Sequence, residues 1–236
     1  MIYILIKKAE EMGIFVSPDA ETLFSEYTDL LLKYNEVMNL TAITDRDEIL
    51  VKHYLDSLSP LAFSLIEDKK SVVDVGTGAG FPGLPLKIGK RDISLTLIDS
   101  LKKRVEFLKT VAKELSLEGV SAIHGRAEEK GHDETLREQF DYAVSRAVAP
   151  LSILAEYCLP FVKVGGSFLA LKGPAPEEEI EDGKKAIETL GGKIEKIYHV
   201  KLPGDIIHSI VLIKKISHTP PSYPRKPGKP SKSPIK

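Results

Sequence analysis

The chain has 236 residues, 42% of them hydrophobic and 28% charged, which is ordinary for a globular protein and long enough for one large α/β domain with an appendage. Its 33 basic and 34 acidic residues nearly balance, so overall charge does not indicate a nucleic-acid-binding protein. The single cysteine, Cys158, excludes an intrachain disulfide and a metal cluster built on cysteines.

The sequence shows no sign of a membrane span or an export signal. No apolar run approaches the roughly twenty residues that a transmembrane helix needs. Residues 1–6 are apolar but lack a basic leader and a small-residue cleavage site, so we expect no signal peptide. These features favour a cytoplasmic protein.

The first 66 residues predict a helical cap. The Ser-Pro-Asp sequence at residues 17–19 favours a helix start, and apolar residues recur every three or four positions over residues 23–38. After a break at residues 39–41, a second helical pattern covers about residues 44–58. The segment offers too little apolar surface for a core of its own, so we expect it to pack on the main domain.

Short apolar segments alternate with helical patterns from residue 71 onward, which implies a parallel sheet with helices on both faces. A short turn joins the last two strands, so the final strand should be antiparallel. We therefore expect an α/β fold with a seven-stranded, mostly parallel sheet. The expected strands are 71–75, 94–98, 119–123, 140–144, 166–172, 193–199 and 207–215, and the expected domains are 1–66 (cap), 67–218 (sheet domain) and 219–236 (tail).

Asp74 ends a β-branched apolar run that breaks into glycines, which predicts a buried strand turning tightly into a helix. Such a turn exposes its backbone to a ligand, typically a nucleotide-like cofactor. Gly78, Gly80 and Gly83 fit the dinucleotide pattern of nicotinamide and flavin enzymes. Gly76, Gly78 and Gly80 instead follow the strand directly and resemble motif I of the class I methyltransferases, which bind S-adenosylmethionine. A purely structural turn is the third interpretation.

Acidic residues follow the next two expected strands. Asp99 lies 19 positions after Gly80, where an acid accepts hydrogen bonds from cofactor ribose hydroxyls; its alternative role is to cap the next helix. Glu128 and Ala127 follow the third strand, at the place for an adenine, and the alternative for Glu128 is a helix-start acid. Asp99 and the antiparallel final hairpin favour the methyltransferase register and a class I methyltransferase Rossmann-like fold.

Arg146 follows the fourth strand, beside the open end of such a pocket. An arginine there can bind a phosphate, stack on a base or pair with the carboxylate of the cofactor, and the alternative is a plain surface arginine. His53, Asp56 and Ser57 share one helical segment, but no strained turn presents the serine as a nucleophile. We expect His53 to lie between the cap and the sheet, near the pocket mouth. The remaining histidines show no ligand spacing, so no metal is predicted.

Residues 219–236 contain no acid, and five basic residues stand there among six prolines. Such a segment should stay extended until an anionic partner orders it. Arg225, Lys226 and Lys229 are therefore candidates for RNA binding, with a solvated tail as the alternative.

Several segments together resemble the RsmG family, also called glucose-inhibited division protein B. The resemblance covers residues from about 20 to the C-terminus. Its segments are Asn39-Leu40-Thr41, residues 52–58 (KHYLDSL), residues 74–83 (DVGTGAGFPG), Asp99 with Lys103-Arg104, Ser145-Arg146-Ala147 and residues 223–228 (YPRKPG). Members of this family are bacterial class I methyltransferases that methylate N7 of a guanine in 16S ribosomal RNA.

The resemblance implies S-adenosylmethionine as cofactor and 16S ribosomal RNA as partner, within the small subunit or free, with a monomeric enzyme expected. It further implies that Gly76 and Phe81 contact the cofactor, that Ala127 and Glu128 lie by its adenine, and that Arg146 shares the pocket. With the motif residues, the cofactor-binding candidates are Asp74, Gly76, Gly78, Gly80, Phe81, Asp99, Ala127, Glu128 and Arg146. The RNA-binding candidates are His53, Lys103, Arg104, Arg146, Arg225, Lys226 and Lys229.

Guanine N7 has a free lone pair and no proton to remove, so methyl transfer to it needs alignment and exclusion of water. We therefore expect no general base and name no catalytic residue. Two other functions compete: an oxidoreductase that uses the dinucleotide register, and an RNA-binding protein that kept the fold but lost catalysis.

Overall fold

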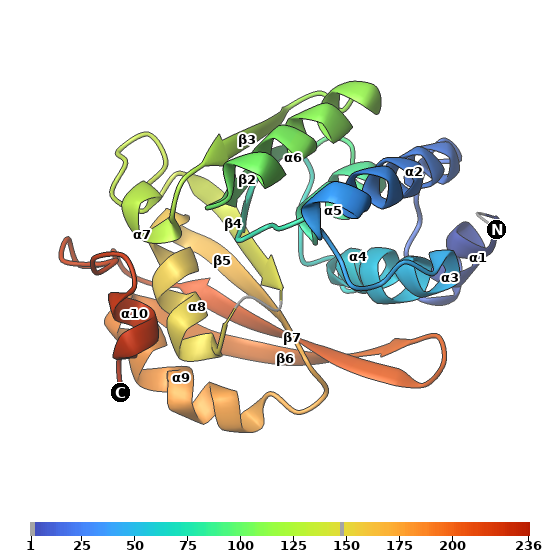
Figure 1. Cartoon of the computed structure of the whole chain (residues 1–236). Coiled ribbons are helices and arrows are strands. Elements are labelled where there is room, and N and C mark those ends of the chain that lie inside the picture. The colour runs from blue at the N-terminus through green and yellow to red at the C-terminus, as the bar shows by residue number, and fades with distance from the viewer. Residues whose placement is uncertain (1–2, 147–148) are drawn as a thin grey trace.

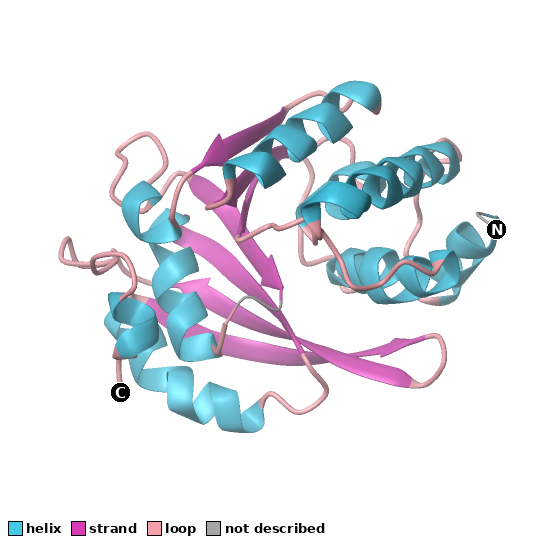
Figure 2. Cartoon of the chain, viewed as in Figure 1, coloured by secondary structure: helices cyan, strands magenta, loops and turns pink. Residues whose placement is uncertain are grey.

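The computed structural model describes residues 3–146 and 149–236, and these form one seven-stranded sheet with helices on both faces (Figures 1 and 2). The strand order is β3-β2-β1-β4-β5-β7-β6. The strands are β1 (Ser71–Val75), β2 (Ser94–Asp99), β3 (Val120–His124), β4 (Phe140–Arg146), β5 (Val162–Lys172), β6 (Gly192–Leu202) and β7 (Ile206–Lys215).

Strands β1 to β5 pair in parallel, and β7 runs antiparallel to both β5 and β6. The class I methyltransferase topology and the antiparallel final strand expected from the sequence are thus confirmed. Strand β5 begins at Val162, four residues earlier than expected, because Val162 pairs with Phe140 ahead of a register shift in β4.

The helices divide between the two faces of the sheet. Alternation along β1 sends Val72 into a core shared with the N-terminal helices, whereas Val73 and Val75 enter the core under α8 and α9. The helical elements are α1 (Tyr3–Glu11), α2 (Ala20–Met38), α3 (Arg46–Ile49), a π-helix (Leu50–Leu55), α4 (Asp56–Ala62), α5 (Gly83–Gly89), α6 (Lys102–Glu114), α7 (Ala127–Lys130), α8 (Leu151–Cys158), a 3-10 turn (Leu159–Phe161), α9 (Glu177–Thr189) and α10 (Lys229–Lys232).

The N-terminal helices pack on the sheet domain, next to α5 and α6 (Figure 1). Phe24 and Tyr27 of α2 are buried in the same core as Leu84 of α5 and Phe107 of α6. Large side chains such as these lose their contact with water only because the two parts pack together. None of the helices in the described ranges is long and apolar enough to cross a membrane.

The C-terminal segment is folded, and the expectation that it is extended is wrong. The side chain of Glu156 on α8 is 1% exposed and accepts hydrogen bonds of 2.6–3.1 Å from the backbone and guanidinium of Arg225. Pro230 is buried, and residues 229–232 form α10. A buried carboxylate needs a partner. The tail's own composition gives no sign of this acid, which lies 69 positions away.

Candidate active site

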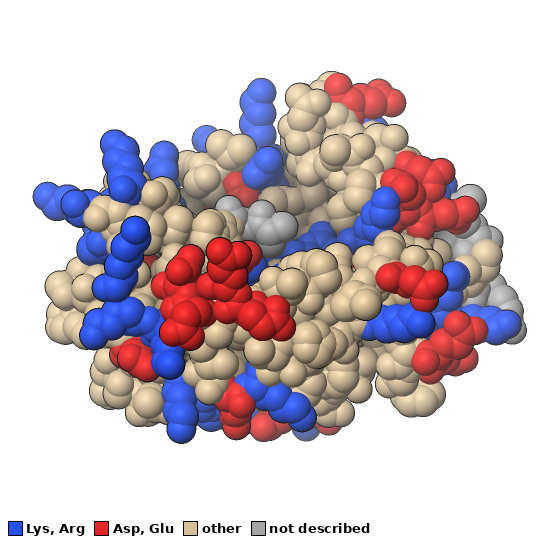
Figure 3. Space-filling model, turned by 90° about the horizontal axis from the view of Figure 1, so that it is seen from below, with Lys and Arg blue, Asp and Glu red and all other residues tan. Residues whose placement is uncertain are grey.

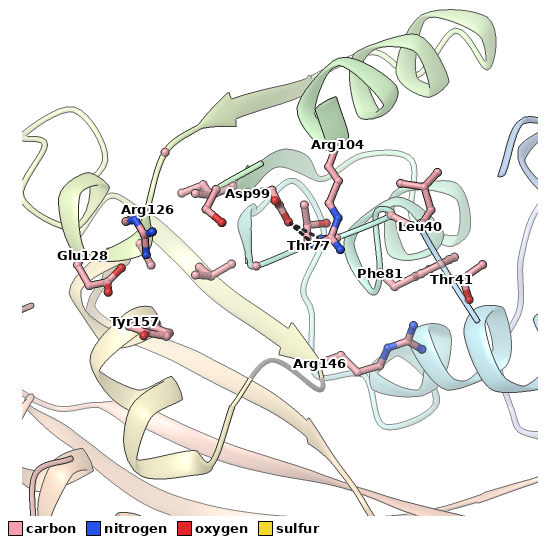
Figure 4. Close-up of a pocket in the computed structure, with 18 of the residues that line it drawn as sticks. Leu40, Thr41, Thr77, Phe81, Asp99, Arg104, Arg126, Glu128, Arg146 and Tyr157 are labelled. Carbon is pink, nitrogen blue, oxygen red and sulfur yellow. Dashed lines mark hydrogen bonds and ion pairs between the residues drawn. The ribbon is translucent and has the colours of Figure 1, made fainter. Parts of the chain in front are cut away.

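A cavity of about 490 Å³ lies at the carboxyl ends of β1, β2 and β4 (Figure 4). This is the edge of a doubly wound sheet at which ligands bind. The start of α7 and part of α8 bound one end of the cavity, and the π-helix and the α2–α3 connection bound the other. The predicted site residues on its wall are Gly76, Gly78, Phe81, Asp99, Ala127, Glu128 and Arg146, with the RNA-contact candidates His53 and Arg104.

The glycine turn forms the floor of the cavity. Gly76 and Gly78 adopt left-handed φ angles of 73° and 61°, which residues with a Cβ rarely adopt. The turn is held from behind, because the buried Tyr27 of α2 donates a 2.5 Å hydrogen bond to the carbonyl of Ala79. The cap therefore supports the loop on which the site depends.

Asp74 and Gly80 lie behind the turn and not on the cavity wall. The Oδ2 of Asp74 accepts hydrogen bonds from the Thr77 hydroxyl at 2.7 Å and from the Gly83 N–H at 2.8 Å. Burial raises the pKa of Asp74 to about 7. These two predicted site residues thus shape the turn, and a direct contact with a ligand is not supported by their position.

Asp99 connects the glycine turn to α6. Its Oδ2 accepts a hydrogen bond from the Gly78 N–H at 2.9 Å, and its Oδ1 accepts one from the Leu101 N–H at 2.8 Å. The guanidinium of Arg104 lies 3.7 Å from Oδ2. Each carboxylate oxygen has two acceptor positions, so each keeps one for a hydroxyl group of a ligand. Supporting the helix start and binding a ribose are therefore compatible roles.

The end of the cavity beside α7 is lined by Ala127 and Glu128 (Figure 4). Glu128 is buried, and its Oε1 accepts a 3.0 Å hydrogen bond from the Gly228 N–H. Arg126 and Tyr157 also line this end, and sequence reasoning missed both. Tyr157 belongs to α8, whose apolar pattern gives no sign that one of its residues reaches a ligand site.

Arg146 anchors the opposite end, and its side chain is only 13% exposed, which excludes a plain surface arginine. Its Nη1 donates to the carbonyls of Lys52 and His53 at 3.1 and 3.3 Å and to Oδ2 of Asp56 at 2.9 Å. The guanidinium also lies 5.0 Å from the centre of the Phe81 ring. Both carbonyls belong to the π-helix, an irregular element that is frequent at functional sites.

His53 lies between the cap and the cavity, as the sequence predicts. Its ring stacks on Phe81 with centroids 4.5 Å apart, and its Nε2 lies 2.8 Å from the Thr41 hydroxyl. Burial and the charge of Arg146 lower the pKa of His53 to about 4. The ring is therefore neutral at pH 7, so Nδ1 accepts from Nη2 of Arg146 at 3.3 Å and Nε2–H donates to Thr41.

The depressed pKa of His53 predicts an acid-dependent loss of stability. Between its unfolded value of 6.5 and its folded value of about 4, the unfolded chain binds the proton more readily, so stability is full above pH 6.5 and falls toward pH 4. We expect protonation of His53 to lower the free energy of unfolding by roughly 2 kcal/mol between pH 6.5 and pH 4, after a discount for solvent screening. Urea unfolding of the native chain and of His53→Gln at pH 7 and pH 4.5 measures the difference. Equal losses in the two proteins would contradict the assignment.

The remaining candidates lie outside the cavity. Lys103 is exposed on α6, and Lys226 and Lys229 are exposed on the C-terminal segment. Arg225 is held by Glu156, which occupies the donors that a phosphate would need. Ala147, part of the resemblance after β4, lies outside the described residues. Among the residues described, no three His, Cys, Asp or Glu side chains gather as a metal site would require.

Comparison with solved structures agrees with the observed topology. A SAM-dependent methyltransferase from Aquifex aeolicus superposes with a TM-score of 0.54 at 19% identity, covering 74% of this chain and 96% of that one. The TYW2 protein of M. jannaschii in complex with AdoMet gives a TM-score of 0.51 at 19% identity, covering 64% of this chain and 71% of that one. At these identities the likeness establishes the fold alone.

Sequence comparison is more specific. The "Ribosomal RNA small subunit methyltransferase G" of Alkaliphilus metalliredigens is 54% identical over 234 residues, covering 99% of this chain and 98% of the relative. The protein of the same name from Thermoanaerobacter sp. is 49% identical over 235 residues, with the same coverage. The family model for GidB, described as rRNA small subunit methyltransferase G, matches residues 20–207. The family resemblance of the motifs is thereby confirmed, and the chain belongs to the rRNA small subunit methyltransferase G family.

Proposed function

We propose that this protein transfers a methyl group from S-adenosylmethionine to N7 of a guanine in 16S ribosomal RNA, as a monomer in the cytoplasm. Family membership supports the reaction and the class of RNA. The observation that carries the proposal is the cavity at the carboxyl edge of the sheet, which is lined by the glycine turn and Asp99, with Glu128 at one end and Arg146 at the other.

The residues of the cavity fit S-adenosylmethionine. A Cβ added to Gly78 would meet nothing within 4 Å, so the turn leaves open space next to its backbone. Asp99 would hold the ribose hydroxyls, and Glu128 would accept a hydrogen bond from the adenine amino group. The bound cofactor supplies an electrophilic methyl group on a sulfonium sulfur.

The acceptor guanine is expected next to Arg146. A second cavity of about 640 Å³ shares His53 and Arg146 with the first and is further lined by Lys52, Lys172 and His208. Asp56 and Glu179 also line this cavity, but Lys52, Lys172 and Arg146 outnumber them, so the balance of charge favours an anionic, phosphate-bearing ligand. A base that enters here approaches the first cavity along the shared wall.

The side chains on the shared wall align the reactants and exclude water. Neutral His53 offers no basic nitrogen, because its Nδ1 accepts from Arg146 and its Nε2–H is directed to Thr41. Guanine N7 needs no base, since it carries a lone pair and no proton. The imidazole of His53 and the guanidinium of Arg146, which contact each other, both lie against the ring of Phe81, so that Phe81 gives the first cavity a fixed apolar surface beside this wall on which to align a planar base.

The proposal is tested by binding and by product analysis. We expect calorimetric titration to detect binding of S-adenosylhomocysteine and no binding of NAD. Purified small subunits, or their RNA, from a strain that lacks this protein should gain one methylated guanine on incubation with enzyme and S-adenosylmethionine. Binding of NAD alone would support an oxidoreductase instead, and RNA binding without methyl transfer would support an inactive RNA-binding protein.

The exposed lysines of the C-terminal segment are proposed to contact RNA phosphates. Seen from below, acidic side chains form a cluster near the centre of the face and Lys and Arg side chains gather to its left, so the phosphates are expected along this basic margin (Figure 3). Replacing Lys226 and Lys229 together with Ala should weaken RNA binding and reduce the slope of log K against log salt by about 1 to 2. The matched control replaces the equally exposed Lys184 and Lys185 of α9. Equal slopes in the two double variants would argue against this contact.

A further inference from the structure

The C-terminal segment touches the cofactor cavity at two of its lining residues. We infer that residues 227–236 are a positioning element of the cofactor site, which holds Glu128 and Tyr157 in place and thereby sets the affinity for the adenine end of the cofactor. The inference rests on the proposed function in one respect, namely that the cavity takes S-adenosylmethionine. It assigns to the segment a role that is independent of RNA.

The first contact fixes Glu128. The Gly228 N–H donates to its Oε1 at 3.0 Å, and Gly228 adopts a left-handed φ of 78° at the start of α10. A backbone donor cannot rotate away, so one carboxylate oxygen is held by the turn. The other oxygen accepts no hydrogen bond from the described residues and remains for a ligand. The orientation of Glu128 thus depends on a turn 100 positions further along the chain.

The second contact fixes Tyr157. Its hydroxyl lies 3.1 Å from the Ser231 hydroxyl of α10, and α10 packs against α8 (Figure 1). Tyr157 and Glu128 both line this end of the cavity, so the segment contacts two of its lining residues. These two hydrogen bonds, from Gly228 and Ser231, therefore constrain the position of the side chains at the adenine end.

The anchor of the segment lies just before these contacts. Arg225 pairs with the buried Glu156, and the Pro224 carbonyl lies 2.6 Å from Nε2 of His132. A chain that ends after Lys226 keeps this anchor and loses the two contacts to the cavity, together with the Arg225 bond to the Ser233 carbonyl, the buried Pro230 and the packing of Ile235 on the core. Point variants at the two contacts, which leave this packing in place, separate the positioning role from the anchoring role.

Calorimetric titration with S-adenosylhomocysteine, without RNA, tests the inference. Deletion of residues 227–236 should weaken binding about tenfold, as expected for the loss of two orienting hydrogen bonds. An affinity within twofold of the full chain would overturn the inference. If the full chain itself binds no S-adenosylhomocysteine, the proposed function fails and the inference falls with it, so the two failures are distinguishable.

Point variants decide the question if the deleted chain does not fold. Gly228→Ala combined with Ser231→Ala keeps every lysine, and it should raise KM for S-adenosylmethionine several-fold while kcat stays within twofold. The matched control is Gly204→Ala in the β6–β7 turn, where φ is 81° and an added Cβ likewise meets nothing within 4 Å. A merely structural role would lower the unfolding temperature in both proteins and leave both KM values unchanged, which would also overturn the inference.

Discussion

The Arg146→Ala variant is expected to lose about 100-fold in kcat/KM for methyl transfer. The wall shared by the two cavities then lacks the guanidinium that helps to align the reactants. The change also leaves the Asp56 carboxylate, 4% exposed, without its arginine partner and with the hydrogen bond to Nδ1 of His208 as its remaining side-chain contact among the described residues. Removing one member of a buried pair costs about 3 kcal/mol. Thermal unfolding at pH 7 and methylation of small-subunit RNA measure the two effects separately.

Two further variants serve as comparisons: the first separates geometry from charge at Arg146, and the second removes a different arginine of the same cavity. Arg146→Lys keeps the charge but not the planar fork, so its activity should lie between those of the native chain and Arg146→Ala. Arg104→Ala removes another arginine of the same cavity, whose side chain is 33% exposed and 3.7 Å from Asp99. The Arg104→Ala variant should lower the free energy of unfolding by less than about 1 kcal/mol and the activity only a few-fold. A loss in Arg104→Ala as large as in Arg146→Ala would refute the special position of Arg146.

Gly80→Ala is expected to lower stability by about 3 kcal/mol, from left-handed strain, overpacking and a lost hydrogen bond. At its φ of 107°, an added Cβ would lie 2.5 Å from Leu84 and 2.6 Å from the Tyr27 hydroxyl. The buried Tyr27 would have to move and release the Ala79 carbonyl. For a chain of this size the unfolding temperature should fall by about 10 °C.

Gly78→Ala is the matched variant for this prediction. Its added Cβ meets open space in the cavity, so the cost to stability is only the left-handed strain of about 1 kcal/mol. Binding of S-adenosylhomocysteine should fall more than stability does, because the methyl group enters the ligand space. Gly78 is assigned to the cavity wall and Gly80 to the support of the turn. This assignment would be wrong if the two glycine variants showed the same ratio of stability loss to binding loss.

The sheet could be predicted from the sequence because each strand carries a local signal. An apolar run bounded by polar or glycine residues marks a buried strand, as at residues 71–75, and the short turn before β7 requires an antiparallel partner. Strand ends are less certain, since pairing with a neighbour sets them, as Phe140 does for the start of β5.

The residues of the site could be predicted where a charged residue lies at the carboxyl end of a strand. Asp99 and Arg146 lie directly at the ends of β2 and β4, and fold topology alone brings them to one edge. Tyr157 and the anchor of Arg225 were not predictable, because each depends on which face of α8 meets a segment far away in the sequence. Composition described the tail's charge correctly but could not reveal its buried partner.

The strand order has a consequence for how the chain folds during synthesis. Strand β6 lies at the edge of the sheet and pairs with β7, although β7 follows it in the chain. When β6 leaves the ribosome, the neighbour that it needs has not yet been made, and β5 still presents an unpaired edge. The hairpin can therefore join the sheet only as a unit once β7 has emerged, so this side of the sheet closes after the parallel strands and depends on the last fifth of the chain.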